Sequence, residues 1–564
     1  MGVATLLPKE LQLQVGYFSD LWDKSMPAQK KSPWQILLLL GATGVAIGGG
    51  AIAYLVLRKP PLEAVLPVGS NLIPQSALMS LSLSTNPAQW QQLQQLGTAG
   101  APRALADQLG KLQTQFFSDR KLDYTRDIQP WVGPQATLAV FPLTAATITS
   151  GQDQPQVWVL PIAQPDLAQS TLNRLLSSPT AKLNQRTYKG VDVRETAANV
   201  PYPYAVAVLN QAIVFTSAPA LIDQVIDTAQ GQPSLQQLSR YIPAWEEVYV
   251  PDAFARLYIN LPTAVDQTSS TPSPAPTANP APRLQGLAAN LSLSSGQLHL
   301  QSLTWLKPDS PSQAPLENRP QQLAQRLPAN TLAVYTGSNF QQFWQTYGQA
   351  SITPLPTPLQ ADQIRTNFQT ATGLNFDRDL VGWMNGEFAA ALVPADASGR
   401  GVGLVFLSQT GDRSGAEKAF AQLNQVMQQK RQWLVKTSTV ENQPVTTWKV
   451  PPGLPVATHG WLDQNTSFLT LGTNITPTIL PQPQQPLAQA SLFQAATASV
   501  LKSNSGQLFI DIPRTVSVLE GTPLLPKLSP EVKKAVQGIQ AIGITSARNN
   551  DWSTRYDILI QLDK

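Results

Sequence analysis

The chain has no cysteine, only two histidines and few charged residues. Without cysteine it can form neither disulfide bonds nor thiolate metal sites, and it has no thiol nucleophile. Charged residues make up 13% of the 564 residues, against roughly 25% in a typical globular protein. Much of the surface must therefore carry uncharged polar residues. A chain of this length predicts about two to four domains.

The charges that are present nearly balance. Lys plus Arg number 39 and Asp plus Glu number 35, which gives a formal net charge of +4. Spread over such a long chain, this excess creates no field strong enough to hold a polyanion. The sequence also lacks a basic stripe with interleaved aromatic residues. We therefore expect no binding of nucleic acid.

Motifs that mark common enzyme classes are missing or isolated. His299 and His459 lie far apart in the chain, and neither has a second histidine or a carboxylate at ligand spacing. The GxSxG and HExxH patterns do not occur. Ser118 to Lys121 matches the SxxK pattern, but its companion SDN and KTG patterns are absent. We predict no catalytic site, metal or cofactor, and a hydrolase is the less favoured alternative.

One long apolar segment lies near the N-terminus, from Trp34 to Leu57. It contains no charge, and at about 1.5 Å per helical residue it can cross a hydrocarbon core of about 30 Å. A slight excess of flanking lysine before it favours a cytoplasmic N-terminus. A cleaved signal peptide is the competing interpretation, because Ala51 to Ala53 resembles a cleavage site. The long tail before the segment favours a retained transmembrane helix.

This segment also suggests partners. The lipid bilayer is the predicted partner of Trp34 to Leu57. Gly44 and Gly48 form a GxxxG pair, which either joins two membrane helices in a dimer or reflects the higher glycine content of membrane spans. The sequence favours the second interpretation and leaves the dimer open.

The rest of the chain contains two similar halves. Residues 122–131 (LDYTRDIQPW) align with 374–383 (LNFDRDLVGW) at an offset of 252, from 122 to 374. Similar blocks in the same order at nearly constant spacing indicate an internal repeat. Three further pairs of blocks keep that order: 138–142 with 390–394 at an offset of 252, 74–79 with 328–333 at 254, and 257–262 with 508–513 at 251.

The repeat divides the chain into predicted segments. Each half is long enough to bury its own core. Inside the first half, residues 266–283 are rich in Pro, Ser and Thr, which predicts a disordered, solvated loop. The predicted segments are a tail (1–33), a transmembrane helix (34–57), a linker (58–68), a first α+β repeat (69–307), a Pro-rich linker (308–322) and a second α+β repeat (323–564).

Hydrophobic periodicity assigns the elements of the first half. Met79 to Ser84 alternates apolar and polar residues, which predicts a strand with one buried face. Asn86 and Pro87 predict the N-cap and first turn of a helix. Turns such as Asn210-Gln211 join adjacent strands, so we predict an α+β fold with a mainly antiparallel sheet and helices packed on it. Further strands are predicted at 136–143, 156–162, 188–194, 205–209, 212–216, 256–261, 287–294 and 297–306, and helices at 103–117, 166–176, 220–229 and 235–241.

The most distinctive block of the repeat is Arg-Asp-(Ile/Leu)-x-x-Trp, and two interpretations compete. In the first, the aspartates satisfy backbone N–H groups in a turn and the tryptophans pack as core anchors. In the second, the indoles line a groove for a peptide, lipid or pigment, which requires them to be partly exposed. The candidate residues for binding or structure are Arg126, Asp127 and Trp131 in the first half and Arg378, Asp379 and Trp383 in the second.

Two motifs carry a family resemblance. NPAQW (Asn86 to Trp90) follows a predicted strand, and DIQPWVG (Asp127 to Gly133) precedes one. With the N-terminal anchor, they resemble a family of cyanobacterial membrane-anchored proteins described only as a domain of unknown function. The resemblance covers nearly the whole chain after the tail and implies a plasma or thylakoid membrane, with the body in the periplasm or lumen. It implies no activity, cofactor or functional residue.

Together these features favour a membrane-tethered, extracytoplasmic binding or scaffold protein that is not an enzyme. Its protein partners are not identified by the sequence. The alternative is a carrier or sensor of an apolar small molecule, such as a lipid or pigment, held within or between the halves.

Overall fold

The computed structural model describes residues 62–563 except for 97–99, 121, 144–153, 177–182, 198–199, 201, 269–283, 311–316, 320, 350–360, 396–400, 523–524 and 526. The predicted tail, the apolar segment from Trp34 to Leu57 and the pair Gly44 and Gly48 lie outside the described residues, so these predictions stay predictions. Among the helices that are described, none is both long and apolar enough to cross a bilayer.

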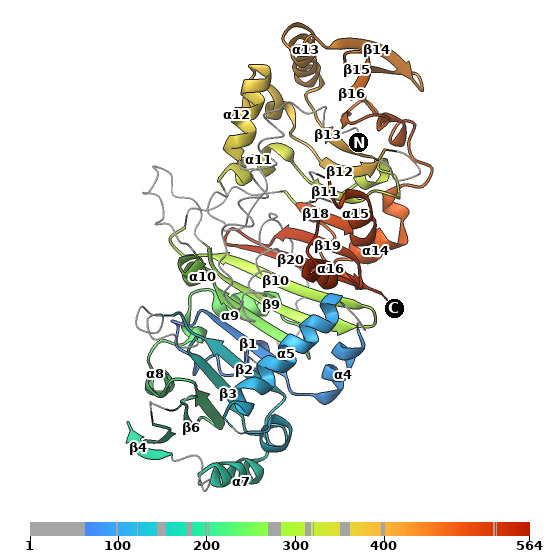
Figure 1. Ribbon diagram of the computed structural model, residues 1–564. Helices are drawn as coiled ribbons and strands as arrows, with labels where there is room; N and C mark the ends of the chain where they lie inside the picture. The colour runs from blue at the N-terminus through green and yellow to red at the C-terminus, as the bar shows by residue number, and fades with distance from the viewer. Residues whose placement is uncertain are drawn as a thin grey trace.

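The described chain forms one large sheet in which all paired strands are antiparallel (Figure 1). This confirms the mixed α and β class and the antiparallel sheet. The strands of the first half are β1 (Met79–Ser84), β2 (Gln135–Val140), β3 (Gln156–Pro161), β4 (Asn184–Tyr188), β5 (Val191–Glu195), β6 (Ala205–Leu209), β7 (Ala212–Thr216), β8 (Ala255–Asn260), β9 (Leu284–Ser294) and β10 (Gln297–Leu306).

The second half also contributes ten strands. In space the first ten follow the order β4-β5-β6-β7-β3-β2-β1-β8-β9-β10, and the second ten follow β14-β15-β16-β17-β13-β12-β11-β18-β19-β20. Each label in the second series is ten higher than its counterpart in the first. These strands are β11 (Ala333–Gly337), β12 (Phe388–Pro394), β13 (Val402–Gln409), β14 (Leu434–Val440), β15 (Gln443–Val450), β16 (Leu454–Trp461), β17 (Thr466–Leu471), β18 (Gly506–Asp511), β19 (Ile539–Arg548) and β20 (Ser553–Leu562).

The two series join edge to edge through their last strands. β10 pairs with β20 from Gln297 against Gln561 to Trp305 against Ser553. We expected each half to form its own sheet around its own core, whereas the structure has a single sheet of twenty strands. The physical reason is that both final strands are long and expose a row of unpaired amides at the edge of their half, which pairing satisfies. Ile539 and Leu562 of the second half accordingly belong to a core cluster of the first.

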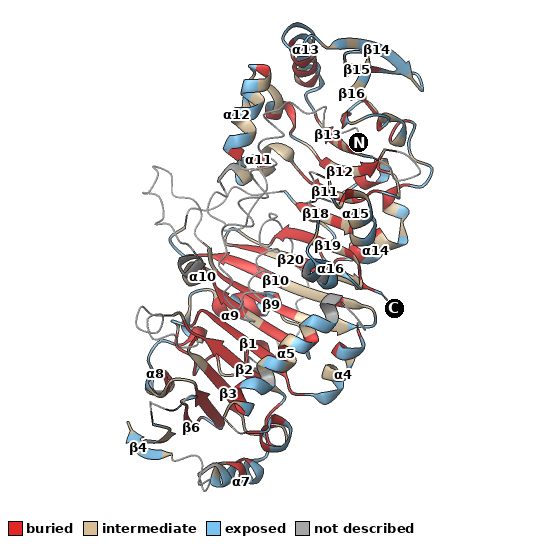
Figure 2. Cartoon of the chain, in the orientation of Figure 1, coloured by how far each residue is buried: buried red, intermediate tan, exposed pale blue. Residues whose placement is uncertain are grey.

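Helices cover both faces of the sheet, which makes three layers. In the first half α4 and α5 cover the face of the sheet on which the Trp158 side chain lies. Helices α8 and α9 cover the opposite face, on which Val157 lies. Figure 2 shows the strands largely buried beneath helices whose outer sides are exposed. The helices are α3 (Leu62–Val65), α4 (Pro87–Gln95), α5 (Gly100–Ser118), α7 (Pro165–Leu176), α8 (Pro219–Ala229), α9 (Tyr241–Glu247), α10 (Leu261–Thr268), α11 (Phe340–Gln349), α12 (Ala361–Thr372), α13 (Arg413–Gln429), α14 (Ser491–Ala496), α15 (Ile512–Leu519) and α16 (Pro530–Val536).

Several predicted elements need correction. β1 was expected to bury one face, but all six of its residues are buried, because β1 is a central strand covered on both sides. Its serine face is accommodated by polar contacts such as Ser82 Oγ to Thr137 Oγ1 at 2.6 Å. The strand predicted at 188–194 is a hairpin of β4 and β5, since Lys189 and Gly190 turn the chain with positive φ.

Two helical boundaries also differ from prediction. The helix predicted at 235–241 is a short 3-10 turn, η2 (Leu235–Gln237), followed by α9. The loop predicted from 266 begins later, because α10 continues to Thr268, and the rest of that loop lies outside the described residues.

Candidate functional site

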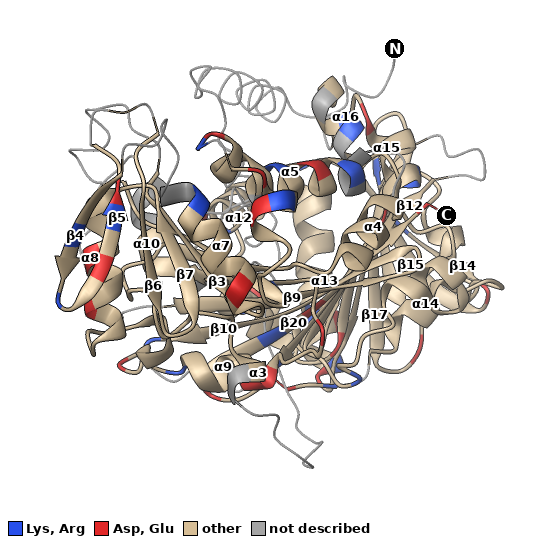
Figure 3. Cartoon of the chain, turned by 90° about the horizontal axis from the view of Figure 1, so that it is seen from below, with Lys and Arg blue, Asp and Glu red and all other residues tan. Residues whose placement is uncertain are grey.

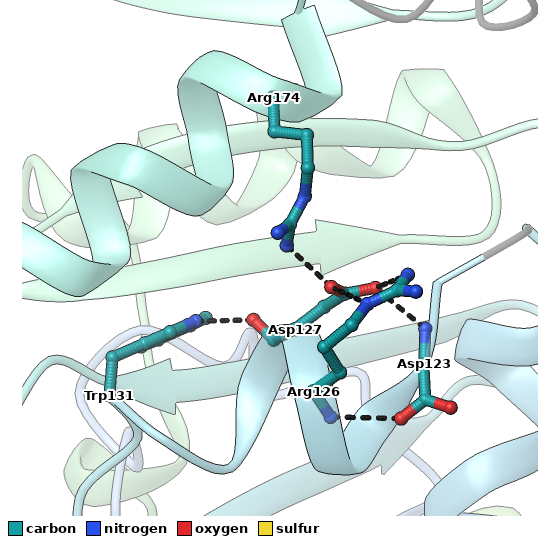
Figure 4. Close-up of polar contacts among 5 residues, drawn as sticks. All are labelled: Asp123, Arg126, Asp127, Trp131 and Arg174. Atoms are coloured by element: carbon teal, nitrogen blue, oxygen red, sulfur yellow. Dashed lines mark hydrogen bonds and ion pairs between the residues drawn. The ribbon is translucent and has the colours of Figure 1, made fainter.

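The Arg-Asp block of the first half forms a π-helical turn, η1 (Tyr124–Ile128), which links α5 to β2. Its wide turn is closed by the N–H of Gln129, which donates to the carbonyl of Tyr124 at 2.8 Å. Two carboxylates cap its start (Figure 4). Asp123 Oδ1 accepts from the N–H of Arg126 at 2.8 Å, and Asp127 Oδ2 accepts from the N–H of Asp123 at 2.8 Å.

Asp127 is the centre of this arrangement, because its buried carboxylate binds two arginines. Arg126 reaches it with Nε at 2.9 Å and Nη2 at 3.0 Å, and Arg174 on α7 donates a second contact to Oδ1. Only 1% of the Asp127 side chain is exposed. The hydrogen bonds from Arg126 lower the pKa of Asp127 below its ordinary value, although burial acts in the opposite direction.

Trp131 anchors the end of the same turn in the core. Its ring nitrogen donates to the backbone carbonyl of Asp127 at 2.6 Å, and the residue is 1% exposed. It belongs to the core cluster that also holds Trp158 and Phe117. The indole therefore buries its apolar body and satisfies its one donor locally.

The second half repeats this geometry in η4 (Phe376–Leu380). Asn375 Oδ1 accepts from the N–H of Arg378 at 2.8 Å, and Asp379 Oδ2 accepts from the N–H of Asn375 at 2.8 Å. Arg378 binds Asp379 at 2.7 and 3.0 Å, which lowers the pKa of Asp379. The environment differs, since Asp379 is 13% exposed and no second arginine of the described chain forms an ion pair with it.

Trp383 is 4% exposed and packs with Phe420 on α13. Unlike Trp131, its ring nitrogen has no hydrogen-bond partner among the described residues. The groove interpretation required partly exposed indoles, and both indoles are buried. The geometry therefore matches the packing interpretation, in which these residues hold the turn that leads into a strand.

An open hollow of about 310 Å³ lies beside η1. Arg126 lines this hollow and also belongs to the ion pairs around Asp127. Its side chain is 68% exposed. Its Nε and Nη2 are bound to Asp127, and the carboxylate of Asp123 also lines the hollow, so the local charge does not favour an anion there. The hollow is lined by Thr114, Ser118, Leu122, Asp123, Tyr124, Thr125 and Arg126.

A second polar cluster lies at the junction of the halves. Asp557 on β20 is 1% exposed and accepts from His299 Nε2 on β10, from Ser499 Oγ at 2.5 Å and from the N–H of Val500 at 2.9 Å. Burial by itself would raise the pKa of Asp557, but these contacts together lower it below its ordinary value. The serine and the histidine both bind the carboxylate, so the order of contacts is not that of a Ser-His-Asp triad.

His459 lies in an apolar site of the second half. Its ring stacks on Phe420 with centroids 4.4 Å apart, and Nε2 lies 2.8 Å from Asn424 Oδ1. Burial lowers the pKa of His459 to about 4, so the ring is neutral at pH 7. Within the described ranges, no three His, Asp or Glu residues gather where they could hold a metal ion.

Sequence reasoning missed the long-range members of both clusters. Arg174 lies 47 residues from Asp127, and His299 lies 258 residues from Asp557. No local spacing connects such residues, although pairing of β10 with β20 would have brought His299 and Asp557 together. Figure 3 shows that Lys, Arg, Asp and Glu are spread over many elements as small groups of both signs.

Comparisons with known proteins give a family but no activity. A family model described as "Protein of unknown function (DUF3352)" matches residues 38–562. No curated protein matches the chain. Crystal forms III and I of TP0453 match with TM-scores of 0.24 each and 10% identity, over 43% of this chain and 80% and 79% of theirs. Form IV matches with a TM-score of 0.23 and 9% identity, over 42% and 80%.

Proposed function

The chain belongs to the DUF3352 family, and we propose that it is a membrane-tethered binding or scaffold protein and not an enzyme. The observation that carries the proposal is the joining of two ten-stranded arrays into one sheet through β10 and β20. A continuous sheet covered on both faces makes a wide, stiff body with open strand edges at its two ends. Such a body suits the holding of other proteins.

The polar clusters support this proposal because their groups are engaged in holding the fold. Asp127 closes a turn and binds α7 through Arg174, whereas Asp557 ties β20 to β10 and to the loop after α14. Both carboxylates are held ionised by lowered pKa values, which is the opposite of what a general acid at neutral pH requires.

We further propose that the two halves are homologous repeats. The sequence offsets of 254, 252 and 251 carry Leu81, Leu138 and Leu257 onto Tyr335, Ala390 and Leu508. In the first half Leu81 pairs with the other two leucines, and in the second half Tyr335 pairs with the corresponding two residues. Register and sequence alignment therefore agree residue by residue, which supports duplication of an ancestral half.

Tethering is proposed from the apolar segment Trp34 to Leu57. We propose a single-pass plasma or thylakoid membrane protein of cyanobacterial type, with a cytoplasmic N-terminus and the body in the periplasm or lumen. Washing membranes with alkaline carbonate should leave the chain in the pellet, and protease added from the body's side should release the body by cutting the chain ahead of α3. Release of the intact chain by carbonate would contradict tethering.

The binding role is tested by affinity capture of the full chain from gently solubilised native membranes. We expect the same partner proteins in near-stoichiometric amounts in repeated captures, and none with an unrelated single-pass protein that carries the same tag. Chemical crosslinking before solubilisation should increase their yield. Captures that contain only the chain itself, with and without crosslinking, would contradict the proposal.

One observation favours a second candidate function, a carrier or sensor of a lipid or pigment. The aromatic side chains of α11 gather on one side, where the rings of Phe343 and Tyr347 are stacked with centroids 5.9 Å apart and both residues are half-buried. Trp344 lies beside them, 5.7 Å from Tyr347. Mass spectrometry of an organic extract of the purified full chain should then detect one stoichiometric apolar compound. An extract that matches the detergent blank would reject this candidate.

A further inference from the structure

The sheet ends at two open edges, β4 in the first half and β14 in the second, which lie at opposite ends of the molecule (Figure 1). Among the described strands β4 pairs only with β5, and β14 pairs only with β15. An unpaired edge is a template for an added strand. The two edges are not equally suited to that role.

β14 directs a regular row of backbone groups away from its neighbour. It is joined to β15 by a two-residue turn, Glu441-Asn442, in which both φ angles are positive, at 47° and 63°. In such a hairpin the residues that flank the turn exchange both backbone hydrogen bonds, and every second residue does so after that. The N–H and C=O groups of Val435, Thr437 and Thr439 therefore point to the open side.

β4 is the shorter and more obstructed edge. It has five residues against seven in β14, and its turn at Lys189-Gly190 leaves only Gln185 and Thr187 with outward backbone groups. The Arg186 side chain on β4 forms ion pairs with Glu195 on β5 at 3.0 Å and with Asp223 on α8 at 2.7 Å. Short length is one of the usual means by which an edge is protected from pairing.

The side chains of β14 indicate the chemistry of an incoming strand. Leu434 pairs with Lys449, so Lys436 and Lys449 lie on the same face of the hairpin. Lys436 is exposed, and neither lysine forms an ion pair with a described residue. On the opposite face Val435 packs against the cluster of Trp448 and Phe420. A strand laid along β14 would meet Lys436 and the exposed Leu434 on one face, and Val435 with two threonines on the other.

We propose that the free edge of β14 binds an extended acidic segment of a partner protein, which adds to the sheet as a further strand. The inference rests on the proposed binding function and names its docking site. The backbone of Val435, Thr437 and Thr439 supplies the hydrogen bonds. An acidic residue of the added strand faces Lys436, with Lys449 one strand further away on the same face, and apolar residues at the alternate positions lie beside Val435.

Two synthetic peptides of the length of β14 serve as probes, one alternating valine with glutamate and one alternating valine with lysine, each with a fluorescent label and blocked ends. The full chain in detergent should bind the glutamate peptide at least about tenfold more tightly than the lysine peptide, which corresponds to ~1.4 kcal/mol. Lys436→Glu should reduce or reverse this preference. Equal affinities for the two peptides, or no measurable binding of the glutamate peptide, would overturn the proposal.

A matched pair of proline variants tests the backbone contacts. Thr437→Pro removes one outward N–H without touching the ladder to β15, and should weaken binding of the glutamate peptide by about tenfold. Gln185→Pro makes the same change at the corresponding position of β4, and should alter binding by less than about twofold. Circular dichroism of both variants should match the wild type. Equal losses from the two variants would overturn the assignment to β14.

The same two variants separate this inference from the proposed function. In captures from native membranes, loss of a partner from Thr437→Pro and its retention by Gln185→Pro would support the β14 site. A partner retained by both variants would overturn the site and leave the binding function intact, whereas no partner with the wild type overturns the function itself. If sedimentation shows a wild-type dimer that Thr437→Pro abolishes, a second copy occupies the edge and the acidic segment is wrong.

Discussion

In the first half, the paired residues Leu83 on β1 and Ala136 on β2 place the larger side chain on β1. At the corresponding place in the second half, Gly337 on β11 faces Phe388 on β12, so the larger side chain lies on the partner strand. A Cβ on Gly337 would lie 2.3 Å from the Phe388 ring. The two halves keep the same strand pairing, but the larger side chain of the pair lies on the opposite strand. A packed core constrains the summed volume of the two side chains, and it tolerates different divisions of that volume between them.

A second contrast lies at β9 and β19, where both halves keep an aromatic residue on the partner strand. Ala288 on β9 pairs with Tyr258, and its counterpart on β19 is Gly543, which pairs with Phe509. In the second half α14 lies so close that a Cβ on Gly543 would meet the backbone carbonyl of Ala496 at 1.7 Å. The helix that covers this face therefore sits deeper on the second half, and only glycine leaves room for it.

The largest expected loss of stability comes from disrupting the pair Gly337 and Phe388. Gly337→Leu should destabilise the protein by about 4 kcal/mol, because the new side chain overlaps the Phe388 ring. Adding Phe388→Ala, which copies the first half, should recover at least about 1 kcal/mol relative to the sum of the single changes. Denaturant unfolding of the two single variants and the double variant gives the coupling. Strict additivity would show that the pairs are not equivalent.

The next prediction compares how closely the helices pack on β19 and on β9. Gly543→Ala should cost about 3 kcal/mol, since the methyl group meets a backbone carbonyl that cannot move without α14. The reverse change in the first half, Ala288→Gly, should cost only about 1 kcal/mol through loss of strand packing and added chain entropy. Both values are read from denaturant midpoints. A Gly543→Ala variant as stable as the wild type would mean that α14 does not lie against β19.

The two Arg-Asp turns should differ by a similar margin. Asp127→Ala should cost about 3 kcal/mol, because it leaves the Asp123 N–H without its acceptor and removes the shared partner of Arg126 and Arg174. Asp379→Ala should cost about 1 kcal/mol, since Asp379 is more exposed and binds a single arginine. Urea unfolding at pH 7 provides the comparison. Equal losses would show that the contact with α7 contributes nothing.

The smallest effect is a dependence on pH confined to the second half. Because the pKa of His459 is lowered to about 4, the unfolded chain takes up a proton below about pH 6.5 that the folded chain refuses. Stability should therefore fall by about 2 kcal/mol between pH 7 and pH 5. The residue at the corresponding place in the first half is Val206, which is buried and cannot titrate. His459→Val should remove this loss, and an unchanged slope would contradict the assignment.

Much of the local structure was predictable because short-range forces decide it. The six residues of β1, the N-cap Asn86 with Pro87 after it, and both ends of β10 lie where periodicity and capping place them. The block at 122–131 was also recognisable, since the capping of η1 involves residues within four positions of each other. The hairpin of β4 and β5 was missed because the turn at Lys189-Gly190 interrupts a run that otherwise alternates like one strand.

The amino-acid sequence by itself determined most elements of the first half, the antiparallel class and the matching order of similar blocks in the two halves, because capping, periodicity and turn chemistry act over a few residues. Only the tertiary structure decided that β10 pairs with β20, that Arg174 completes the partners of Asp127, and that Trp131 and Trp383 are buried. Those contacts join residues tens to hundreds of positions apart. Their energies depend on which faces and edges meet, and no local pattern records that choice.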